Sequence, residues 1–304
     1  YPVQTADAEQ LKNAQSLDLS DYAAQHLSSV HLNQAQNNPL QPDLQYRGFT
    51  ASPLLGNSQG LSVYMNGVRI NEPFGDAVNW DVIPESSIAG LNLMAGSNPL
   101  FGLNTLGGAL SINTKNGFTH PGHSVQAYGG SFNRRAAEFE SGGNKNNLSY
   151  FVTGNWFKED GWRDHSDSDA KQLFGSVGWM SHKTELELTI AAADTDLNGN
   201  GSSPLELLRQ DRKDVFTYPD NTQNELRMAS LSMDHWFTER VLLSNTVYFR
   251  RNDRMTFNGD GSDYDVIASF AFGNGLNEEG DVVITAAECG GGCTAGDIVE
   301  DGEQ

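Results

Sequence analysis

The chain has 304 residues, enough for two domains, but only 38% of them are hydrophobic and 32 are glycine. No apolar run approaches the roughly 18 residues that a membrane-spanning helix requires, which excludes a helical membrane protein. The 39 Asp and Glu outnumber the 19 Lys and Arg, and the resulting charge of −20 would repel a phosphate backbone. This balance excludes a nucleic-acid partner and leaves metal cations and basic partners open.

The first part of the chain combines helical and strand patterns. The first ~35 residues are expected to be helical, with a short amphipathic helix from Leu19 to Val30 that Ser16 or Asp18 can cap. Further on, Asn66-Gly67 lies between two short apolar runs and predicts a hairpin turn. Together with Gly- and Pro-rich connections, these patterns predict a compact α+β unit over residues 1 to 118.

After Gly117 the chain alternates apolar and polar residues in segments of about ten. The clearest segment sets Leu186, Leu188 and Ile190 against Glu185, Glu187 and Thr189. Such strands fit a transmembrane barrel or a soluble sandwich, but tight turns here alternate with long connections, an asymmetry typical of outer-membrane barrels. We expect about seven strands in 119–304, which cannot close an antiparallel barrel of even strand number. The sixth strand, ~224 to 237, alternates poorly, and everything after Asn252 is expected to form a long loop.

The C-terminal segment is strongly acidic. From Met255 to Gln304 there are 11 Asp and Glu and no Lys or Arg, a composition that fits a solvated loop and a disordered tail equally well. Cys289 and Cys293 enclose three glycines and lack the further ligands of a structural zinc site. The two cysteines are expected to form a disulfide in an oxidising compartment, with two unreactive thiols as the alternative.

Two other motifs suggest chemistry. Gly56-Asn57-Ser58-Gln59-Gly60 has the spacing of a hydrolase nucleophile elbow, but a loop with Pro53 precedes the serine and a strand follows it, the reverse of what the elbow needs. Asp194, Asp196 and Asn198 begin like a calcium-binding loop, although Glu206 arrives one residue late. Calcium in an extracellular loop and a plain solvated loop both remain open, and no catalytic residue is expected.

Four segments of the first 118 residues resemble, in sequence and in order, the plug motifs of TonB-dependent outer-membrane receptors. They are Tyr46–Phe49, Val63–Asn71, Asn98–Gly102 and Leu106–Lys115. Within them the motif residues are Arg47, Gly48, Asn66, Gly67, Gly102, Gly107, Gly108 and Lys115. The chain departs from the family at Asn92 and Ala95, where an acidic residue and an arginine are usual, and no TonB box is recognisable before Tyr1.

The resemblance implies an α+β plug domain, 1–118, inside a transmembrane antiparallel β-barrel, of which 119–304 supply the N-terminal part. It implies a receptor in the outer membrane of a Gram-negative bacterium that binds a scarce solute, such as an iron chelate, and imports it to the periplasm. The implied partners are outer-membrane lipid, the small-molecule ligand and the TonB energy-coupling protein, with no cofactor required. The alternatives are a passive channel or adhesin-like barrel without energy coupling and, third, a soluble secreted β protein.

The same resemblance places the segment from Asn71 to Asp81 at the base of a surface funnel. There Phe74 and Trp80 could cover a ligand while Glu72, Asn79 and Asp81 orient it. Asn57 and Gln59, on the loop that starts at Leu54, are expected to contribute. The alternative is that Phe74 and Trp80 simply pack the plug against the barrel wall.

Overall fold

The computed structural model describes residues 3–34, 36–97 and 101–259, and four short strands nearer the C-terminus. The chain divides into two compact units, Tyr1–Asn258 and Gly259–Gln304. The second unit contains two antiparallel pairs, β16 with β19 and β17 with β18. Their bounds are Tyr264–Val266, Ile298–Glu300, Gly275–Leu276 and Val282–Val283. Cys289 and Cys293 lie outside the described residues.

The first unit begins with a small α+β body, which we call the plug. Its described residues form two α-helices, two short 3₁₀ helices and eight strands. In chain order they are β1 (Val3–Asp7), α1 (Ala8–Ala14), α2 (Leu19–His26), β2 (Val30–Asn33), β3 (Asp43–Tyr46), β4 (Phe49–Ala51), β5 (Leu61–Met65), β6 (Val68–Arg69), η1 (Trp80–Val82), η2 (Glu85–Ser87), β7 (Ile88–Ala95) and β8 (Gly108–Thr114).

Capping side chains and glycine turns set these elements locally. Asp18 caps α2 by accepting a hydrogen bond from the Asp21 amide, and Asp7 forms a capping box with Gln10 at α1. Asn66 and Gly67 both have positive φ, 48° and 79°, as the tight turn between β5 and β6 requires. The helix expected to reach Val30 stops at His26, because Val30 starts strand β2.

Two sheets organise the plug. One has the order β1-β7-β8-β5-β6, and its β5–β8 pair is parallel; the other has the order β2-β3-β4. The first sheet brings the N-terminal strand β1 against β7, so that Val3 pairs with Met94. The prediction that the chain begins with helix is therefore wrong for Val3–Asp7, which form strand β1.

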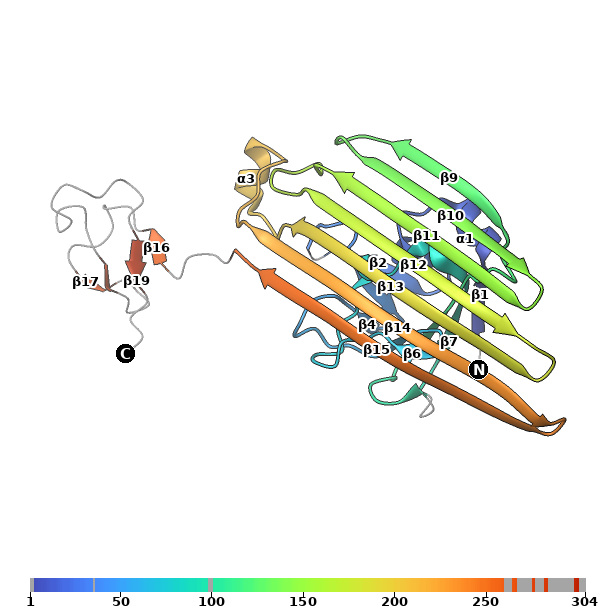
Figure 1. Cartoon of the computed structure of the whole chain (residues 1–304). Coiled ribbons are helices and arrows are strands. Elements are labelled where there is room, and N and C mark those ends of the chain that lie inside the picture. Colours follow the sequence, from blue (N-terminus) through green and yellow to red (C-terminus); the bar gives the residue numbers. More distant parts are fainter. Residues whose placement is uncertain are drawn as a thin grey trace. The chain divides into compact units, whose positions relative to one another are not determined.

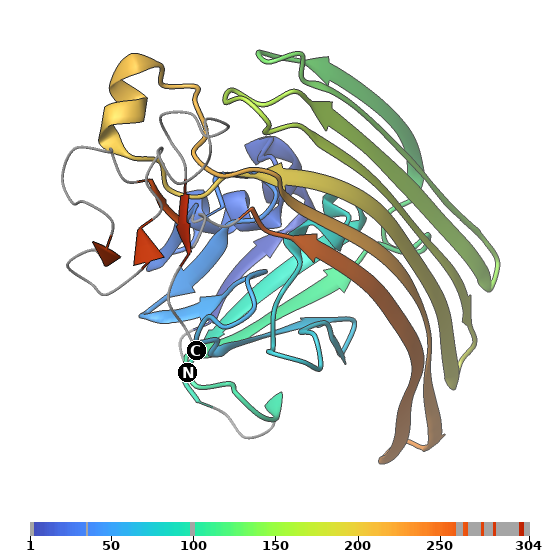
Figure 2. The same cartoon turned by 90° about the vertical axis from the view of Figure 1, so that its left-hand side faces the viewer.

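The rest of the first unit is a seven-stranded antiparallel sheet, which we call the wall. Its strands follow one another in sequence order and have β9 and β15 at the edges. The wall curves around the plug (Figures 1 and 2). Its elements are β9 (Gly122–Gly129), β10 (Arg135–Lys145), β11 (Leu148–Glu159), β12 (Ser168–Met180), β13 (Thr184–Gly199), α3 (Leu205–Gln210), β14 (Asp220–Thr238) and β15 (Val241–Phe257).

The connections of the wall differ between its two ends. Short turns at 146–147, 181–183 and 239–240 lie at one end, and longer connections at 160–167 and 200–219 lie at the other (Figure 1). Helix α3 belongs to the longer of these connections, and we call that end of the sheet the long-loop end. No helix among the described residues combines the length and the apolar character needed to cross a membrane.

Plug and wall share one hydrophobic core. Buried plug residues such as Leu91, Ile112 and Trp80 cluster with Phe151 and Phe174, which point inward from the wall. On the other face of the wall, large apolar side chains stay exposed, for example at Val125, Leu188, Ile190, Val247 and Phe249. The alternation seen in the sequence thus separates a face that packs on the plug from an apolar outer face.

Candidate functional site

The plug segment from Asn71 to Asp81 is held against the wall at both of its ends. Near its start, Glu72 forms a two-pronged ion pair with Arg250 of β15, with Nη2–Oε1 at 2.6 Å and Nη1–Oε2 at 3.2 Å. The amides of Asn79 and Asn252 also donate to Glu72 Oε1, at 3.0 and 2.8 Å. The two charged side chains are only 16% and 10% exposed, so this ion pair is largely shielded from water.

At its other end the segment is anchored through Asp81, which is 1% exposed. Asp81 Oδ2 accepts hydrogen bonds from Thr195 Oγ1 at 2.5 Å and Asn224 Nδ2 at 2.9 Å, and Gln172 Nε2 donates to its main-chain carbonyl. These partners come from β13, β14 and β12. Burial raises the pKa of Asp81, although the two hydrogen bonds act in the opposite direction.

A second ion pair joins the plug to the wall on the side of β10. Lys115, which follows β8, places Nζ 2.7 Å from Glu140 Oε1, and its side chain is 7% exposed. The neighbouring Ser86 on η2 accepts a hydrogen bond from Thr153 Oγ1 at 2.7 Å and donates one to Asn155. Charged contacts between plug and wall are thus supplied here by Lys115 and Glu72.

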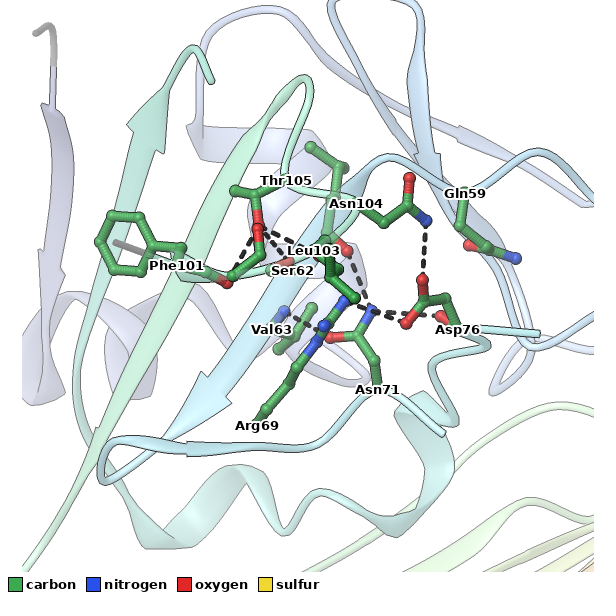
Figure 3. A network of polar contacts seen from close by, with 12 residues as sticks. Gln59, Ser62, Val63, Arg69, Asn71, Asp76, Phe101, Leu103, Asn104 and Thr105 are labelled. Atoms are coloured by element: carbon green, nitrogen blue, oxygen red, sulfur yellow. Dashed lines mark hydrogen bonds and ion pairs between the residues drawn. The ribbon is translucent and has the colours of Figure 1, made fainter. Parts of the chain in front are cut away.

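Three plug loops meet in the polar network drawn in Figure 3. The carboxylate of Asp76 accepts from Arg69 Nη2 at 2.9 Å and from Asn104 Nδ2 at 2.8 Å, and so ties the 71–81 segment to strand β6 and to the 101–107 loop. Asn71 holds the base of the same segment by donating to the carbonyls of Leu61 and Asp76. The loops are therefore held as one body.

Two other plug loops lie at the long-loop end of the wall. Arg254, three residues before the end of β15, donates to the carbonyl of Pro53 at 2.6 Å. The backbone N–H of Asn200, just after β13, donates to the Gln36 carbonyl at 2.6 Å. The backbone carbonyl of Asn200 accepts from Asn37 Nδ2 at 2.9 Å. The plug loops around 36–38 and 52–60 are thereby fixed beside the strand ends that carry long connections.

The expected ligand residues separate into exposed and buried groups. Phe74 is 79% exposed, and Asn57 is exposed on the adjacent loop. Gln59 turns back on its own loop and accepts a hydrogen bond from the Ser52 amide at 2.8 Å. Asn79, Trp80 and Asp81 are no more than 2% exposed. In this conformation these three side chains pack against the wall and Glu72 is paired with Arg250, while their contact with a ligand stays a prediction.

The plug motif residues serve the fold. Arg47 and Gly48, with φ of 52° and 84°, form the turn between β3 and β4, and the Arg47 guanidinium lies 5.3 Å from the Tyr46 ring centroid. Gly102 has φ of 77° in the 101–107 loop. Gly107 allows Phe49 to approach the backbone, since a Cβ there would lie 2.5 Å from the Phe49 side chain. Gly108 opens β8, where a Cβ would lie 2.3 Å from the Met94 carbonyl oxygen.

The expected calcium loop takes a different form. Asp194, Asp196 and Asn198 lie within β13, where alternate side chains share one face but are spaced by about 7 Å. Asp194 and Asn198 are thus about 13 Å apart along the strand, too far to surround one ion. Asp196 instead accepts from Asn221 and Gln223 of β14 at 2.6 and 3.0 Å. The three residues lie on a strand and not on a loop because β13 continues to Gly199, beyond the point where the loop was expected to begin.

Glu85 on η2 is a plug carboxyl whose pKa is raised. Burial is the main cause, with Asp18, Glu138 and Asp21 adding repulsion, and together they raise the pKa of Glu85 to about 8. Because the folded plug then holds this proton more tightly than the unfolded chain, the stability from protonated Glu85 is complete below about pH 4.5 and is lost as the pH rises through about 8.

We therefore expect Glu85→Gln to raise the melting temperature at pH 9 and to leave it unchanged near pH 4, because the amide copies the neutral carboxyl. The measurement is thermal unfolding of the purified protein at both pH values. Glu206→Gln on the exposed helix α3 is the matched control and should show no pH-dependent difference. An equal effect of the two substitutions at pH 9 would contradict a buried, protonated Glu85.

Sequence reasoning missed the wall residues that hold the plug. Arg250, Asn252 and Arg254 share one face of β15, but the residues between them, Arg251 and Asp253, are charged as well, so the run carries no alternation that would have marked the inward face. In addition, the chain after Asn252 was expected to be loop, whereas β15 continues to Phe257. Thr195 and Asn224 carried no signal either, since single small polar residues occur on both faces of such strands.

The fold is that of a receptor plug packed on the first strands of a barrel, and comparison with known proteins agrees. Residues 1–109 match the family model described as TonB-dependent Receptor Plug Domain. No curated protein matches the chain.

Several solved structures are similar to the chain in fold. The ferric yersiniabactin uptake receptor FyuA from Yersinia pestis is 16% identical, with a TM-score of 0.68 over 86% of this chain and 42% of its own. The ferric-catecholate import receptor Fiu from E. coli K12, in its open form, is 14% identical, with a TM-score of 0.69 over 87% and 41%. The unliganded ferric citrate transporter FecA is 13% identical, with a TM-score of 0.70 over 86% and 41%.

These findings confirm the resemblance to TonB-dependent receptors and the fold class. The plug is followed by antiparallel strands arranged as at the start of such a barrel, and the sheet formed by the described strands is open. The chain spans about two fifths of the length of the receptors that it matches.

Proposed function

We propose that this chain is the plug and the first part of the barrel of an energy-coupled outer-membrane receptor. Such a receptor captures a scarce solute at the cell surface and moves it to the periplasm through interaction with TonB. The observation that carries the proposal is the plug itself, seated on the inner face of the wall through two shielded ion pairs. A barrel wide enough for a solute needs such a body to keep it sealed.

The division into a plug over 1–118 and a barrel part over 119–304 belongs to the same proposal. It is supported by the apolar outer face of β9 to β15, which suits lipid, and by the long connections at one end, which suit the exterior of the cell. An outer-membrane location in a Gram-negative bacterium follows from this assignment. The plug loops near Pro53 and Asn37 would then face outward.

An iron chelate is the solute class that we favour. The similar receptors named above take up ferric yersiniabactin, ferric catecholates and ferric citrate. Uptake of ⁵⁵Fe-labelled chelates by a deletion strain, with and without the restored gene, tests the assignment. Restored uptake that disappears in a tonB-deficient background is expected. Uptake that persists there would instead favour the passive channel.

For ligand contact we propose the exposed parts of two neighbouring loops, 54–59 and 71–76. Their side chains are close together, since a Cβ added to Gly75 would lie 3.0 Å from Leu55 Cδ2. Phe74 and Leu55 offer apolar surface, 79% and 50% exposed, and Asn57 offers hydrogen-bonding groups beside them. A ligand held here would touch the body of loops that Asp76 ties together.

Phe74→Ala is expected to weaken binding of the imported chelate about tenfold, the loss of one aromatic contact worth roughly 1.4 kcal/mol. The melting temperature should not change, because the ring is 79% exposed. Binding is measured on whole cells at equal receptor abundance. Phe237→Ala, also exposed but at the short-turn end of the wall, is the control and should bind normally. Unchanged affinity in Phe74→Ala would remove this loop from the binding site.

A further inference from the structure

The outer face of the wall changes from apolar to charged toward its long-loop end. On β13, for example, the exposed Leu188 and Ile190 are followed on the same face by the exposed Asp194 and Asp196. The same change occurs on every strand from β10 to β15, and the first charged residue on each outer face is exposed. In strand order these residues are Arg135, Lys158, Lys171, Asp194, Arg227 and Arg251.

Positively charged residues predominate at this border between the apolar and the charged parts of the outer face. Five of its six residues are Lys or Arg, and only Asp194 is acidic. In the whole chain the proportion is reversed, since 39 Asp and Glu stand against 19 Lys and Arg. The border is thus enriched in cations within an acidic protein, and charge complementarity favours an anionic partner there.

Three of these cations lie together on β10, β11 and β12. Arg135 is directly opposite Lys158 on the neighbouring strand. Lys158 is in turn opposite Asp169, two residues from Lys171, so the two lysines are diagonal neighbours on one face. We call Arg135, Lys158 and Lys171 the cation cluster.

The positive charge of the cation cluster is only partly balanced. Lys158 and Lys171 share one carboxylate, that of Asp169, at 3.9 and 3.4 Å, and within the described part of the chain no other carboxylate forms an ion pair with the cluster. Arg135 donates to the neutral amide oxygen of Asn133 at 2.8 Å. Like charges directly opposite each other destabilise a strand pair, and an anion bound between them would relieve this repulsion.

The two arginines of β14 and β15 differ from the cluster because each has an acidic partner of its own. Arg227 pairs with Glu225, and Arg251 pairs with Asp253, in each case two residues away on the same strand. The charges of these arginines are therefore balanced within the sheet. The positive charge that is left over at the border lies on β10 to β12.

An aromatic side chain lies beside the cation cluster. Trp156 is on the same outer face, opposite Ala137 on one side and Lys171 on the other, and is 38% exposed. Tryptophan is enriched where the hydrocarbon of a membrane meets the headgroups, because its ring is apolar and its N–H is polar. Trp156 and the cation cluster thus lie where the apolar face ends, at the level expected for lipid headgroups.

We propose that the cation cluster binds the phosphate groups of a lipid in the outward-facing leaflet of the membrane. The N–H groups of lysine and arginine donate charge-assisted hydrogen bonds to phosphate oxygens. The acyl chains lie along the adjoining apolar face, to which Leu173 and Val177 of β12 belong. The inference rests on the outer-membrane location proposed above, and the surface is separate from the ligand contact at Phe74.

The test measures binding of diphosphoryl lipid A to the full-length protein in a neutral detergent, with bound lipids counted by native mass spectrometry. Each Lys or Arg beside an anionic lipid surface strengthens binding about fivefold, so the triple variant Arg135→Gln/Lys158→Gln/Lys171→Gln should bind about a hundredfold more weakly. Its melting temperature should match that of the wild type, because exposed ion pairs contribute little to stability.

The salt dependence separates a charged contact from a structural effect. Raising the salt concentration from about 0.05 M to about 0.5 M should weaken binding by the wild type at least about tenfold, because salt screens exposed charges. The residual binding of the triple variant should hardly respond to salt. Wild-type binding that is insensitive to salt would overturn the proposal.

A second triple variant is the matched control. Arg209→Gln/Arg212→Gln/Lys213→Gln also removes three exposed positive charges, from the 200–219 connection at the same end of the wall, and should bind lipid A as the wild type does. Equal binding by the two triple variants would contradict a site at the cation cluster.

Two further ligands identify what the cluster recognises. Lipid A without its phosphates should bind at least about tenfold more weakly than the diphosphoryl form, because the charged contacts are lost. An excess of inorganic phosphate should not displace the lipid, because the acyl chains add apolar contact. Equal binding of the dephosphorylated lipid, or displacement by phosphate, would overturn the proposal of a lipid phosphate site.

The proposed location is tested separately by fractionating the membranes of cells that produce the wild type. Absence of the protein from the outer membrane would overturn that location and the lipid site together. Normal location combined with no binding of diphosphoryl lipid A would overturn the lipid site alone.

Discussion

Replacing Trp80 by alanine is expected to destabilise the plug by about 3–5 kcal/mol, the usual cost of removing a large aromatic side chain from a core. Trp80 is 1% exposed and belongs to the core that plug and wall share, so its removal leaves a cavity bounded by both. The free energy of opening is best measured by native-state hydrogen exchange of the β8 amides, which lie inside the plug sheet.

Trp80→Phe separates packing from polar contact. The indole N–H of Trp80 has no hydrogen-bond partner among the described residues, so phenylalanine removes ring volume without breaking a bond. We expect it to cost less than half as much as alanine. A phenylalanine variant as unstable as the alanine variant would mean that the N–H has a partner in the protein, and an alanine variant of normal stability would mean that Trp80 is not a core residue.

Glu72→Gln is the second substitution with a large expected effect. It leaves the Arg250 guanidinium shielded and without its carboxylate, a situation that costs about 2–4 kcal/mol when some solvent access remains. Hydrogen exchange in the 71–81 segment should accelerate accordingly, because Glu72 is the acceptor that joins Asn79, Arg250 and Asn252. Adding Arg250→Met should recover part of the loss, because the uncompensated charge is then removed.

Asp253→Asn is the matched control for Glu72→Gln. Asp253 pairs with Arg251 on the opposite face of the same strand, with side chains 57% and 64% exposed. Exposed pairs of this kind contribute roughly 0–1 kcal/mol, so the control should hardly change hydrogen exchange in the 71–81 segment. Equal losses at Glu72 and Asp253, or purely additive losses at Glu72 and Arg250, would show that the shielded pair does not hold the plug.

The parts of the fold that local patterns determine were predictable from the sequence. Asn66-Gly67 predicts a tight turn because both residues tolerate positive φ. The alternation around Leu188 predicts a strand with one apolar and one polar face. Strand β1 was missed because its partner β7 lies far along the chain, with Thr5 opposite Asn92. Strand β14 alternates poorly in sequence, yet it forms over Asp220–Thr238 because β13 and β15 pair with it on both sides.

The candidate site was less predictable for a similar reason. Trp80 and Asp81 combine an aromatic ring with a carboxylate, which in sequence resembles a ligand-binding pair as much as a packed one. What buries Asp81 are Thr195 and Asn224, 114 and 143 positions further along the chain. Phe74, with no such partners, keeps the exposure that the sequence led us to expect. Whether a polar plug residue is buried thus depends on wall strands far along the chain, which the sequence around that residue does not reveal.

The distances along the chain that these plug-to-wall contacts span have a consequence for folding kinetics. Glu72 meets Arg250 across 178 positions, and Pro53 meets Arg254 across 201. Closing loops of that length costs entropy before any bond forms, so such contacts arise after the local hairpins of the wall. Substitutions at Glu72 or Arg250 should therefore leave the folding rate almost unchanged and appear instead as faster unfolding, because their contacts are absent from the transition state.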